Sequence, residues 1–441
     1  MSETLTIRNV TLIDCTGAPA TRGADVIVRD GRILATGPGV AESVDSHVID
    51  ATGLFLIPGL WDTETHLTRP VSGVLDDIAL SSSDEVDTES VEAHVGAYLR
   101  YGFTTVVDLG GPEEYLAPLR QRQATGELVG ARVLFTGRQF TAAGGEPANS
   151  DGTRWATVTA DVHEVGQART VIRNMIEEHG IDAVKANLPA GGGVHGPGGP
   201  VLSSTILRML VEEGHAANLP VHVHIDTAEA AMTALDAGVD NIEHMFEPDP
   251  RTLEFDVERV TRLCVETGAY WPFTIVLWEG LSRLGDESLL EELAPETVVV
   301  PRVLERMKSS PASLWNSATD AIRSHYQARF DAAMRYLPHV HSAGVRTTMA
   351  TDAGAPPVFH GPSAVRELSL SVQAGLTPMD VLLAATRDSA RKLRRDLDLG
   401  TLEPGKIADM ILLRDDPLAD ISNVKKVHQV FQGGKVSYST N

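Results

Sequence analysis

Short apolar segments alternate repeatedly with amphipathic helical patterns through the middle of this chain. A serine near the start of residues 203–218 and Thr227 at the start of 227–237 favour helix N-caps. Such alternation predicts an α/β protein with parallel strands and crossover helices. Eight strands, the number in a closed (β/α)8 TIM barrel, are predicted at residues 55–62, 104–109, 131–136, 182–187, 220–225, 241–245, 269–273 and 346–351.

The two ends of the chain have a different pattern, with short strands separated by turn signals. Asp30-Gly31 and Gly433-Gly434 each stand between alternating apolar segments, and the first pair is a strong hairpin signal. The patterns at both ends therefore predict strands that belong to one small β-sandwich-like domain. The expected division is a composite β domain of residues 1–57 plus 401–441, and a barrel of residues 58–400.

One connection in the expected barrel is unusually long. Residues 276–320 exceed a normal strand-to-helix connection and carry Trp278 and Trp315. Long connections at the active-site end of a barrel often close over a substrate. We therefore expect an insertion at about 276–320 that acts as a lid.

Composition and charge limit the cellular compartment and the binding partners that we expect for this chain. The chain has 441 residues, of which 42% are hydrophobic, so it can bury a large core. Its start lacks a basic region followed by an apolar one, and no apolar stretch is long enough to span a bilayer. A formal charge of -23 opposes binding to nucleic acid or anionic membrane. We expect a cytoplasmic protein with a small-molecule substrate; homo-oligomer formation is left open.

The cysteines restrict the kind of metal site that the chain can form. Cys15 and Cys264, the two cysteines, lie far apart in apolar segments. Such positions are more typical of reduced cysteines in a hydrophobic core than of a disulfide or a thiolate metal site. Any metal must therefore be held by histidine and oxygen ligands.

Polar side chains recur where the predicted strands end, which is where barrel enzymes have their active sites. Each alone has an ordinary structural explanation, such as a hydrogen-bonded histidine. Oxygen and imidazole donors at the ends of five strands, however, are what a converging metal site requires. The candidate ligands are Glu64, His66, Lys185, His224, His244 and Asp352.

Several longer motifs carry a resemblance to a known family. PGLWDTETHL resembles the first-strand motif of the amidohydrolase superfamily, Pro-Gly-x-x-Asp-x-His-x-His, and GTLEPGKIADMILLRDDPLADI is similar to its closing segment. AVKANLPAGGG, PVHVHIDTAEAAMTALDAGVDNIEH and MATDAG resemble the imidazolonepropionase-like and Xaa-Pro-dipeptidase-like branch. The similarity covers nearly the whole chain and keeps its order.

The resemblance implies a carbamate, formed from CO2 on Lys185, that bridges two divalent metals. A carbamate is an anionic oxygen ligand that two cations stabilise. A lysine in an apolar strand also has the lowered pKa that carbamate formation needs. Nothing nearby in the sequence supplies a buried anionic partner for Lys185. We expect zinc, with manganese as the alternative, and one or two ions.

Glu64 departs from the motif, which has histidine at its position. As a ligand, the carboxylate adds negative charge, makes bound water less acidic and favours harder ions such as manganese. Alternatively, Glu64 does not reach the metal, or acts as a catalytic acid or base. The motif leaves these alternatives open.

Three further residues are candidates for substrate contacts or for support behind the ligands. His222 and His224 point to the same face of their strand, because strand side chains alternate. The spacing to His244 matches the family when counted from His224, so His222 is expected one layer deeper. Asp226 stands where relatives often have another histidine. His360 lies in the loop after the eighth strand and is a candidate substrate contact.

The leading hypothesis is a metal-dependent hydrolase of an amide or cyclic amide C–N bond. Asp352 would take a proton from metal-activated water and return it to the leaving nitrogen. An N-acyl amino acid or dipeptide-like substrate is implied by the resemblance alone. Two alternatives remain: a metal-assisted lyase or isomerase, prompted by Glu64, and a non-catalytic binding protein on the same scaffold.

Overall fold

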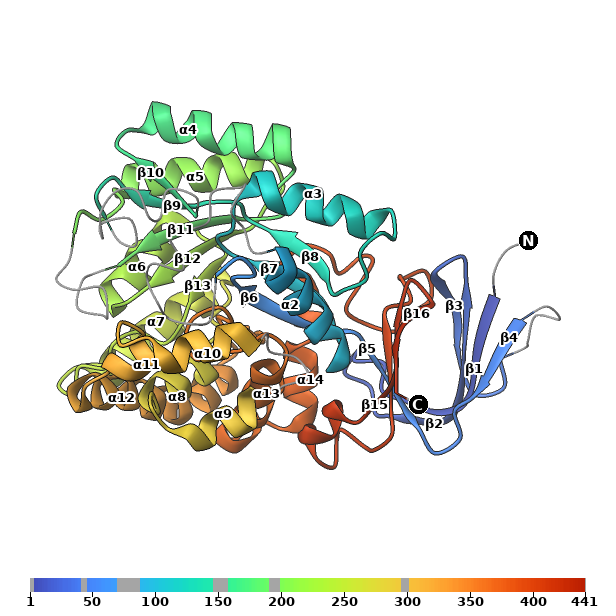
Figure 1. Ribbon diagram of the computed structural model, residues 1–441. Coiled ribbons are helices and arrows are strands. Elements are labelled where there is room, and N and C mark those ends of the chain that lie inside the picture. The colour runs from blue at the N-terminus through green and yellow to red at the C-terminus, as the bar shows by residue number, and fades with distance from the viewer. Residues whose placement is uncertain are drawn as a thin grey trace.

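Parallel strands and helices alternate through the middle of the chain (Figure 1). The computed structural model describes residues 4–40, 46–69, 88–145, 158–189, 199–294 and 301–440. The parallel strands are β6 (Leu60–Thr65), β7 (Phe103–Asp108), β8 (Arg132–Phe135), β9 (Gln139–Ala142), β10 (Thr159–Val162), β11 (Val184–Leu188), β12 (Val221–Ile225) and β13 (Asn241–Glu243).

These strands form two parallel sheets, ordered β6-β7-β8 and β10-β9-β11-β12-β13. Six predicted strand segments contain strands, but residues 55–62 are divided between two sheets. β5 (Phe55–Pro58) belongs to the sheet of the chain ends, and β6 begins after a single intervening residue. Gly59 separates them where an added Cβ would lie 2.0 Å from Thr104 Oγ1, so a side chain does not fit. β9 and β10 were not predicted.

The prediction of full strands at 269–273 and 346–351 is wrong. In these segments only Tyr270 and Arg346 form isolated parallel bridges, from Asn241 to Tyr270 and from Tyr270 to Arg346. Pro272 lacks an N–H and so cannot continue the ladder as a donor. Backbone hydrogen bonds still attach the segments: Trp271 N–H donates to Arg346 O at 3.0 Å, and Thr63 N–H to Met349 O at 3.1 Å.

Helices surround the parallel strands (Figure 1). Ser203 Oγ accepts from Ile206 N–H at 3.3 Å, and Thr227 Oγ1 accepts from Ala230 N–H at 3.2 Å, so both expected N-caps are present. The helices are α2 (Thr88–Arg100), α3 (Glu113–Ala124), α4 (Val165–Asn174), α5 (Ser204–Ala216), α6 (Ala228–Ala237), α7 (Leu253–Thr267), α8 (Ile275–Ser282), α9 (Glu287–Leu293), α10 (Pro301–Ser309), α11 (Leu314–Ser317), α12 (Asp320–Ser342), α13 (Pro362–Ala374), α14 (Pro378–Ala384) and α15 (Arg387–Lys392).

Both ends of the chain contribute to one eight-stranded sheet, which stands beside the larger α/β body (Figure 1). β5 and β14 join the two ends antiparallel, with Met410 opposite Pro58. Asp30 and Gly31 have φ of 49° and 79°, as a two-residue hairpin requires. The remaining strands are β1 (Thr4–Leu12), β2 (Thr21–Arg29), β3 (Arg32–Gly37), β4 (Ser46–Asp50), β14 (Met410–Leu413), β15 (Val427–Gln432) and β16 (Lys435–Ser439).

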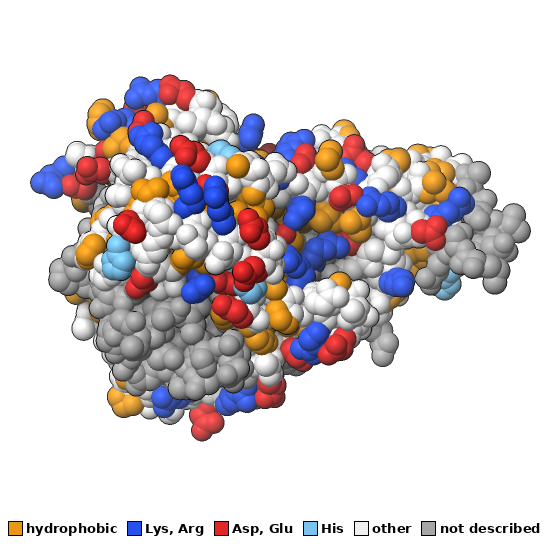
Figure 2. Space-filling model, turned by 90° about the horizontal axis from the view of Figure 1, so that it is seen from above, with side chains coloured by type: hydrophobic (Ala, Val, Ile, Leu, Met, Phe, Trp, Pro, Cys, Tyr) orange, Lys and Arg blue, Asp and Glu red, His pale blue; other side chains and the backbone are white. Residues whose placement is uncertain are grey.

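The described parts of residues 276–320 are largely helical, with α8 to α11 preceding α12. Their role as a lid stays a prediction, as do the sandwich-like packing and the boundaries of the terminal domain. On the face that Figure 2 shows, acidic and basic side chains are interspersed. Among the described helices, none has both the length and the apolar character needed to cross a bilayer.

Candidate metal centre

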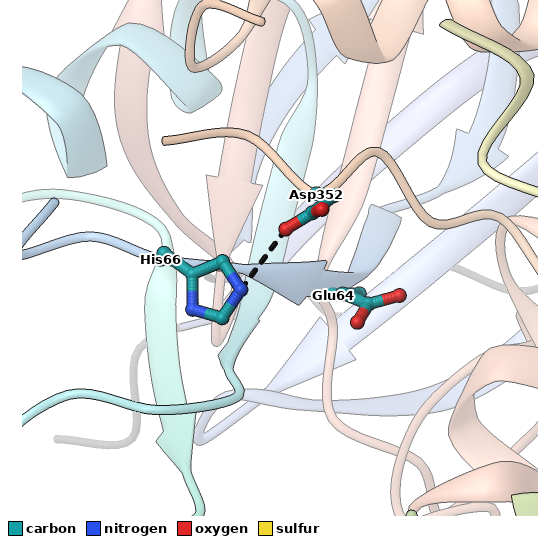
Figure 3. Close-up of side chains that lie close together, drawn as sticks. All are labelled: Glu64, His66 and Asp352. Atoms are coloured by element: carbon teal, nitrogen blue, oxygen red, sulfur yellow. Dashed lines mark ion pairs between the residues drawn. The ribbon is translucent and has the colours of Figure 1, made fainter. Parts of the chain in front are cut away.

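Glu64, His66 and Asp352 come together at the end of β6. One potential ligand atom from each lies within 4.8 Å of the other two. His66 Nε2 is 2.9 Å from Asp352 Oδ1, and the two side chains point toward each other with Glu64 beside them (Figure 3). The predicted first and eighth strand ends are therefore adjacent in space.

Backbone hydrogen bonds attach the Asp352 loop to β6. Asp352 N–H donates to Glu64 O at 2.9 Å, and His66 N–H donates to Ala353 O at 2.7 Å. Asp352 has a φ of 59°, a conformation that aspartate tolerates better than most residues but that still costs energy. The loop is thus fixed in a strained geometry that directs the carboxylate toward His66.

The donor set of this trio fits a divalent metal. Glu64 Oε2 and His66 Nδ1 are buried and have no hydrogen-bond partner among the described residues. Buried polar atoms without a partner are rare and point to a water or an ion. Burial and the charge of Glu243 hold the pKa of Glu64 well above its ordinary range, which a nearby cation would counteract. Imidazole nitrogen and carboxylate oxygen are ligands for zinc and manganese.

The histidines of the centre are held in the neutral form that metal binding needs. Burial lowers the pKa of His66 to about 4, and burial with the charge of His224 lowers that of His244 to about 3. His244 Nδ1 lies 2.9 Å from Thr274 Oγ1, which leaves Nε2 facing Glu64 Oε1 at 3.4 Å. A neutral imidazole whose second nitrogen is hydrogen-bonded is a typical metal ligand.

Lys185 has a buried acidic partner, Glu64, although nothing near the lysine in the sequence supplies one. Its Nζ lies 2.9 Å from Glu64 Oε1, and the two side chains are 2% and 1% exposed. The partner comes from β6, 121 positions earlier in the chain, where inspection of the neighbouring sequence could not find it. The residue that departs from the motif is therefore the one in contact with the lysine.

The remaining candidates lie around this trio. The ring of His224, on β12, packs 4.9 Å from the ring of His244 between centroids, and its side chain is partly exposed. His222 lies two positions earlier on the strand and is fully buried. His360 is buried and stacks on His94, with ring centroids 3.8 Å apart. Its proposed contact with substrate stays a prediction.

Comparison with known proteins establishes the family. The model of the amidohydrolase family matches residues 55–437, which is most of the chain. The chain belongs to the amidohydrolase family. As an amidohydrolase, it is an enzyme of a family that acts on C–N bonds, and metal binding is typical of that family.

Individual relatives of this amidohydrolase are distant. Ochratoxinase of Aspergillus niger is 26% identical over 409 residues, covering 86% of this chain and 75% of the relative. The 5'-deoxyadenosine deaminase of Methanothermobacter thermautotrophicus is 23% identical over 440 residues, covering 93% and 85%. A solved Xaa-Pro dipeptidase with bound methionine superposes with a TM-score of 0.76 at 22% identity, covering 99% of this chain and 100% of its own. At that identity the likeness shows a shared fold alone.

A second buried charge cluster lies beneath the trio of this amidohydrolase. Glu243 Oε1 lies 2.8 Å from His222 Nδ1 and accepts from Lys392 Nζ at 3.3 Å. The glutamate and the lysine are fully buried, and the charge of Lys392 with the His222 contact holds the pKa of Glu243 well below its ordinary range despite burial. Sequence reasoning missed both residues, although Glu243 immediately precedes His244.

Lys392→Met is expected to lower the free energy of unfolding by about 3–5 kcal/mol, because it leaves Glu243 as an uncompensated buried charge. Chemical denaturation of metal-free protein measures this change. Lys426→Met is the control, since Lys426 pairs with Asp415 at 2.7 Å on the exposed surface and should change stability by less than about 1 kcal/mol. Equal losses in the two variants would contradict a buried structural pair.

Proposed function

We propose that this amidohydrolase is a metal-dependent hydrolase of an amide or cyclic amide C–N bond in a small molecule. The observation that carries the proposal is the buried trio of Glu64, His66 and Asp352, whose ligand atoms lie within 4.8 Å of one another. Named relatives are an ochratoxinase, a D-hydantoinase and a dihydroorotase. An N-acyl amino acid or dipeptide-like substrate is the finer proposal.

We further infer that the two parallel sheets are parts of one closed barrel, accompanied by a terminal domain of residues 1–57 plus 401–441. Thr65 bridges to Ala353, and Thr63 N–H donates to Met349 O. On the other side, Asp182 N–H donates to Phe135 O at 2.8 Å, which links the β8 end to the segment before β11. These contacts support closure around the strand ends that carry the trio.

In this proposal the metal is held by six side chains, with zinc as the expected ion, manganese as the alternative, and one or two ions bound. A bound divalent ion supplies a water that is acidic enough to be deprotonated near neutral pH. Lys185 would contribute oxygen atoms as its carbamate, and carbamate formation requires its amine to leave Glu64. The holding residues are Glu64, His66, Lys185, His224, His244 and Asp352.

Asp352 is the proton-transfer residue of the proposed reaction. The hydrogen bond with His66 opposes the effect of burial, and the pKa of Asp352 stays below its ordinary value, so Asp352 is ionised and can accept a proton. The accepted proton is then delivered to the leaving nitrogen, which makes an amine a competent leaving group. One carboxylate thus serves bond formation and bond cleavage.

A metal-assisted lyase or isomerase is the second candidate, favoured by one observation. Because burial and Glu243 raise the pKa of Glu64, this side chain can hold a proton and act as a general acid. Hydrolysis incorporates oxygen from water into the product, whereas isomerisation does not. Turnover in ¹⁸O-labelled water therefore distinguishes the two reactions for any substrate found.

Protein prepared with zinc or manganese is expected to hold about one to two equivalents per chain. Chelation should abolish turnover of N-acyl amino acids or dipeptides, and added metal should restore it. Elemental analysis and a turnover assay on the same preparation measure both. Well under one equivalent in metal-supplemented protein would contradict the proposed centre and would favour a non-catalytic binding protein.

A further inference from the structure

Arg329 reaches the candidate centre from α12, and it lies 103 positions beyond Asp226 in the chain. Its side chain is 3% exposed, and its guanidinium carbon lies 4.7 Å from the ring centroid of Trp278. Nη2 is 3.1 Å from Asp226 Oδ1 and 3.1 Å from Glu247 Oε1. A buried guanidinium is thus fixed by two carboxylates and one aromatic face.

Asp226 connects this arginine to a candidate ligand. One carboxylate oxygen, Oδ1, faces Arg329, while the other, Oδ2, lies 3.5 Å from His224 Nε2. A carboxylate on that side favours the tautomer with the proton on Nε2, which leaves the lone pair on Nδ1. Ligating histidines commonly give their second N–H to such a group, which fixes both the tautomer and the ring.

We propose that Asp226 and Arg329 are positioning residues for His224, acting in series. Arg329 holds Asp226, and Asp226 orients the imidazole so that Nδ1 is presented to the metal. The inference rests on the proposed function, because it requires His224 to bind metal. It also attaches α12 to the centre, so the helix that follows the long insertion takes part in metal binding.

The experiment measures zinc affinity of metal-free, folded variants by competition with a chromogenic chelator. Asp226→Asn keeps the shape but removes the charge, and Arg329→Met keeps the stem against Trp278. Each should weaken zinc binding about 10- to 100-fold. Arg329→Lys retains a cation and should recover part of the affinity. Arg335→Met is the matched control, because Arg335 is an exposed residue on the same helix that covers Tyr336 at 5.1 Å.

The double variant Asp226→Asn/Arg329→Met decides whether the residues act in series, since coupled residues give non-additive effects. We expect the double variant to bind zinc about as weakly as Asp226→Asn alone. Wild-type affinity in both single variants, or fully additive losses, would overturn the inference. Circular dichroism of each variant tests whether unfolding causes the loss of affinity. If Arg329→Met does not fold, the isosteric Asp226→Asn variant still tests the inference. Absence of zinc binding in the wild type would instead contradict the proposed function.

Discussion

Asp352→Asn is expected to lower kcat/KM by about 10²- to 10⁴-fold, the usual contribution of a positioned proton-transfer residue. Asparagine keeps the size of the side chain and can remain beside His66, but it cannot accept a proton at neutral pH. The measurement is kcat/KM at saturating metal, with the bound metal determined on the same sample, so that loss of ion is separated from loss of proton transfer.

Asp398→Asn is the matched control for this substitution. Asp398 pairs with Arg32 at 2.7 Å, with half of each side chain exposed, and lies outside the candidate centre. Its replacement should leave kcat/KM unchanged. If metal-loaded Asp352→Asn turned over substrate at the wild-type rate, Asp352 would not be the proton-transfer residue, and another group would have to protonate the leaving nitrogen.

Glu64→His is expected to tighten zinc relative to manganese by about tenfold, equivalent to ~1.4 kcal/mol, and to increase the carbamate on Lys185. The substitution restores the imidazole found in the family motif and removes one negative charge from the site. It also removes the carboxylate that lies 2.9 Å from Lys185 Nζ. Without that counter-ion the neutral amine is favoured, and the neutral amine is the form that combines with CO2. Metal titrations and ¹³C NMR in labelled bicarbonate measure the two effects.

Comparison with Glu64→Gln and Glu64→Ala separates the possible roles of this residue. If Glu64 transfers a proton without touching metal, Glu64→His and Glu64→Gln should both abolish turnover while metal stoichiometry stays at the wild-type value. A ligand role predicts altered metal affinity instead. Wild-type metal content and turnover in Glu64→Ala would show that the departure from the motif has no chemical consequence.

The parts of the fold that the sequence predicted are those fixed by local interactions. The caps at Ser203 and Thr227 depend on a side chain and a backbone N–H three residues later, so a short pattern identifies them. The prediction of strands at 269–273 and 346–351 was wrong, and it involves both a local and a long-range effect. Pro272 interrupts the ladder, while pairing at Tyr270 depends on two partners elsewhere in the chain.

The candidate site likewise contains residues that the sequence predicts and contacts that it does not. His66 and Asp352 follow recognisable motifs, and the structure brings them within 2.9 Å of each other. The contacts of Lys185 with Glu64 and of Arg329 with Asp226 join positions 121 and 103 residues apart. A single sequence contains no local signal for such pairs, because only the folded arrangement of strands and helices makes them neighbours.

The sheet shared by the two ends of the chain has a consequence for the order of folding during synthesis. β5 pairs with β14, and β5 is separated only by Gly59 from β6, which carries Glu64. β1 to β5 leave the ribosome first, yet one edge of β5 stays without its partner until almost the whole chain has been made. Late long-range pairing of this kind is slow and leaves strand edges open to association. We therefore expect nascent chains that end before residue 410 to engage chaperones through this edge, and release from the ribosome to be followed by a slow docking step.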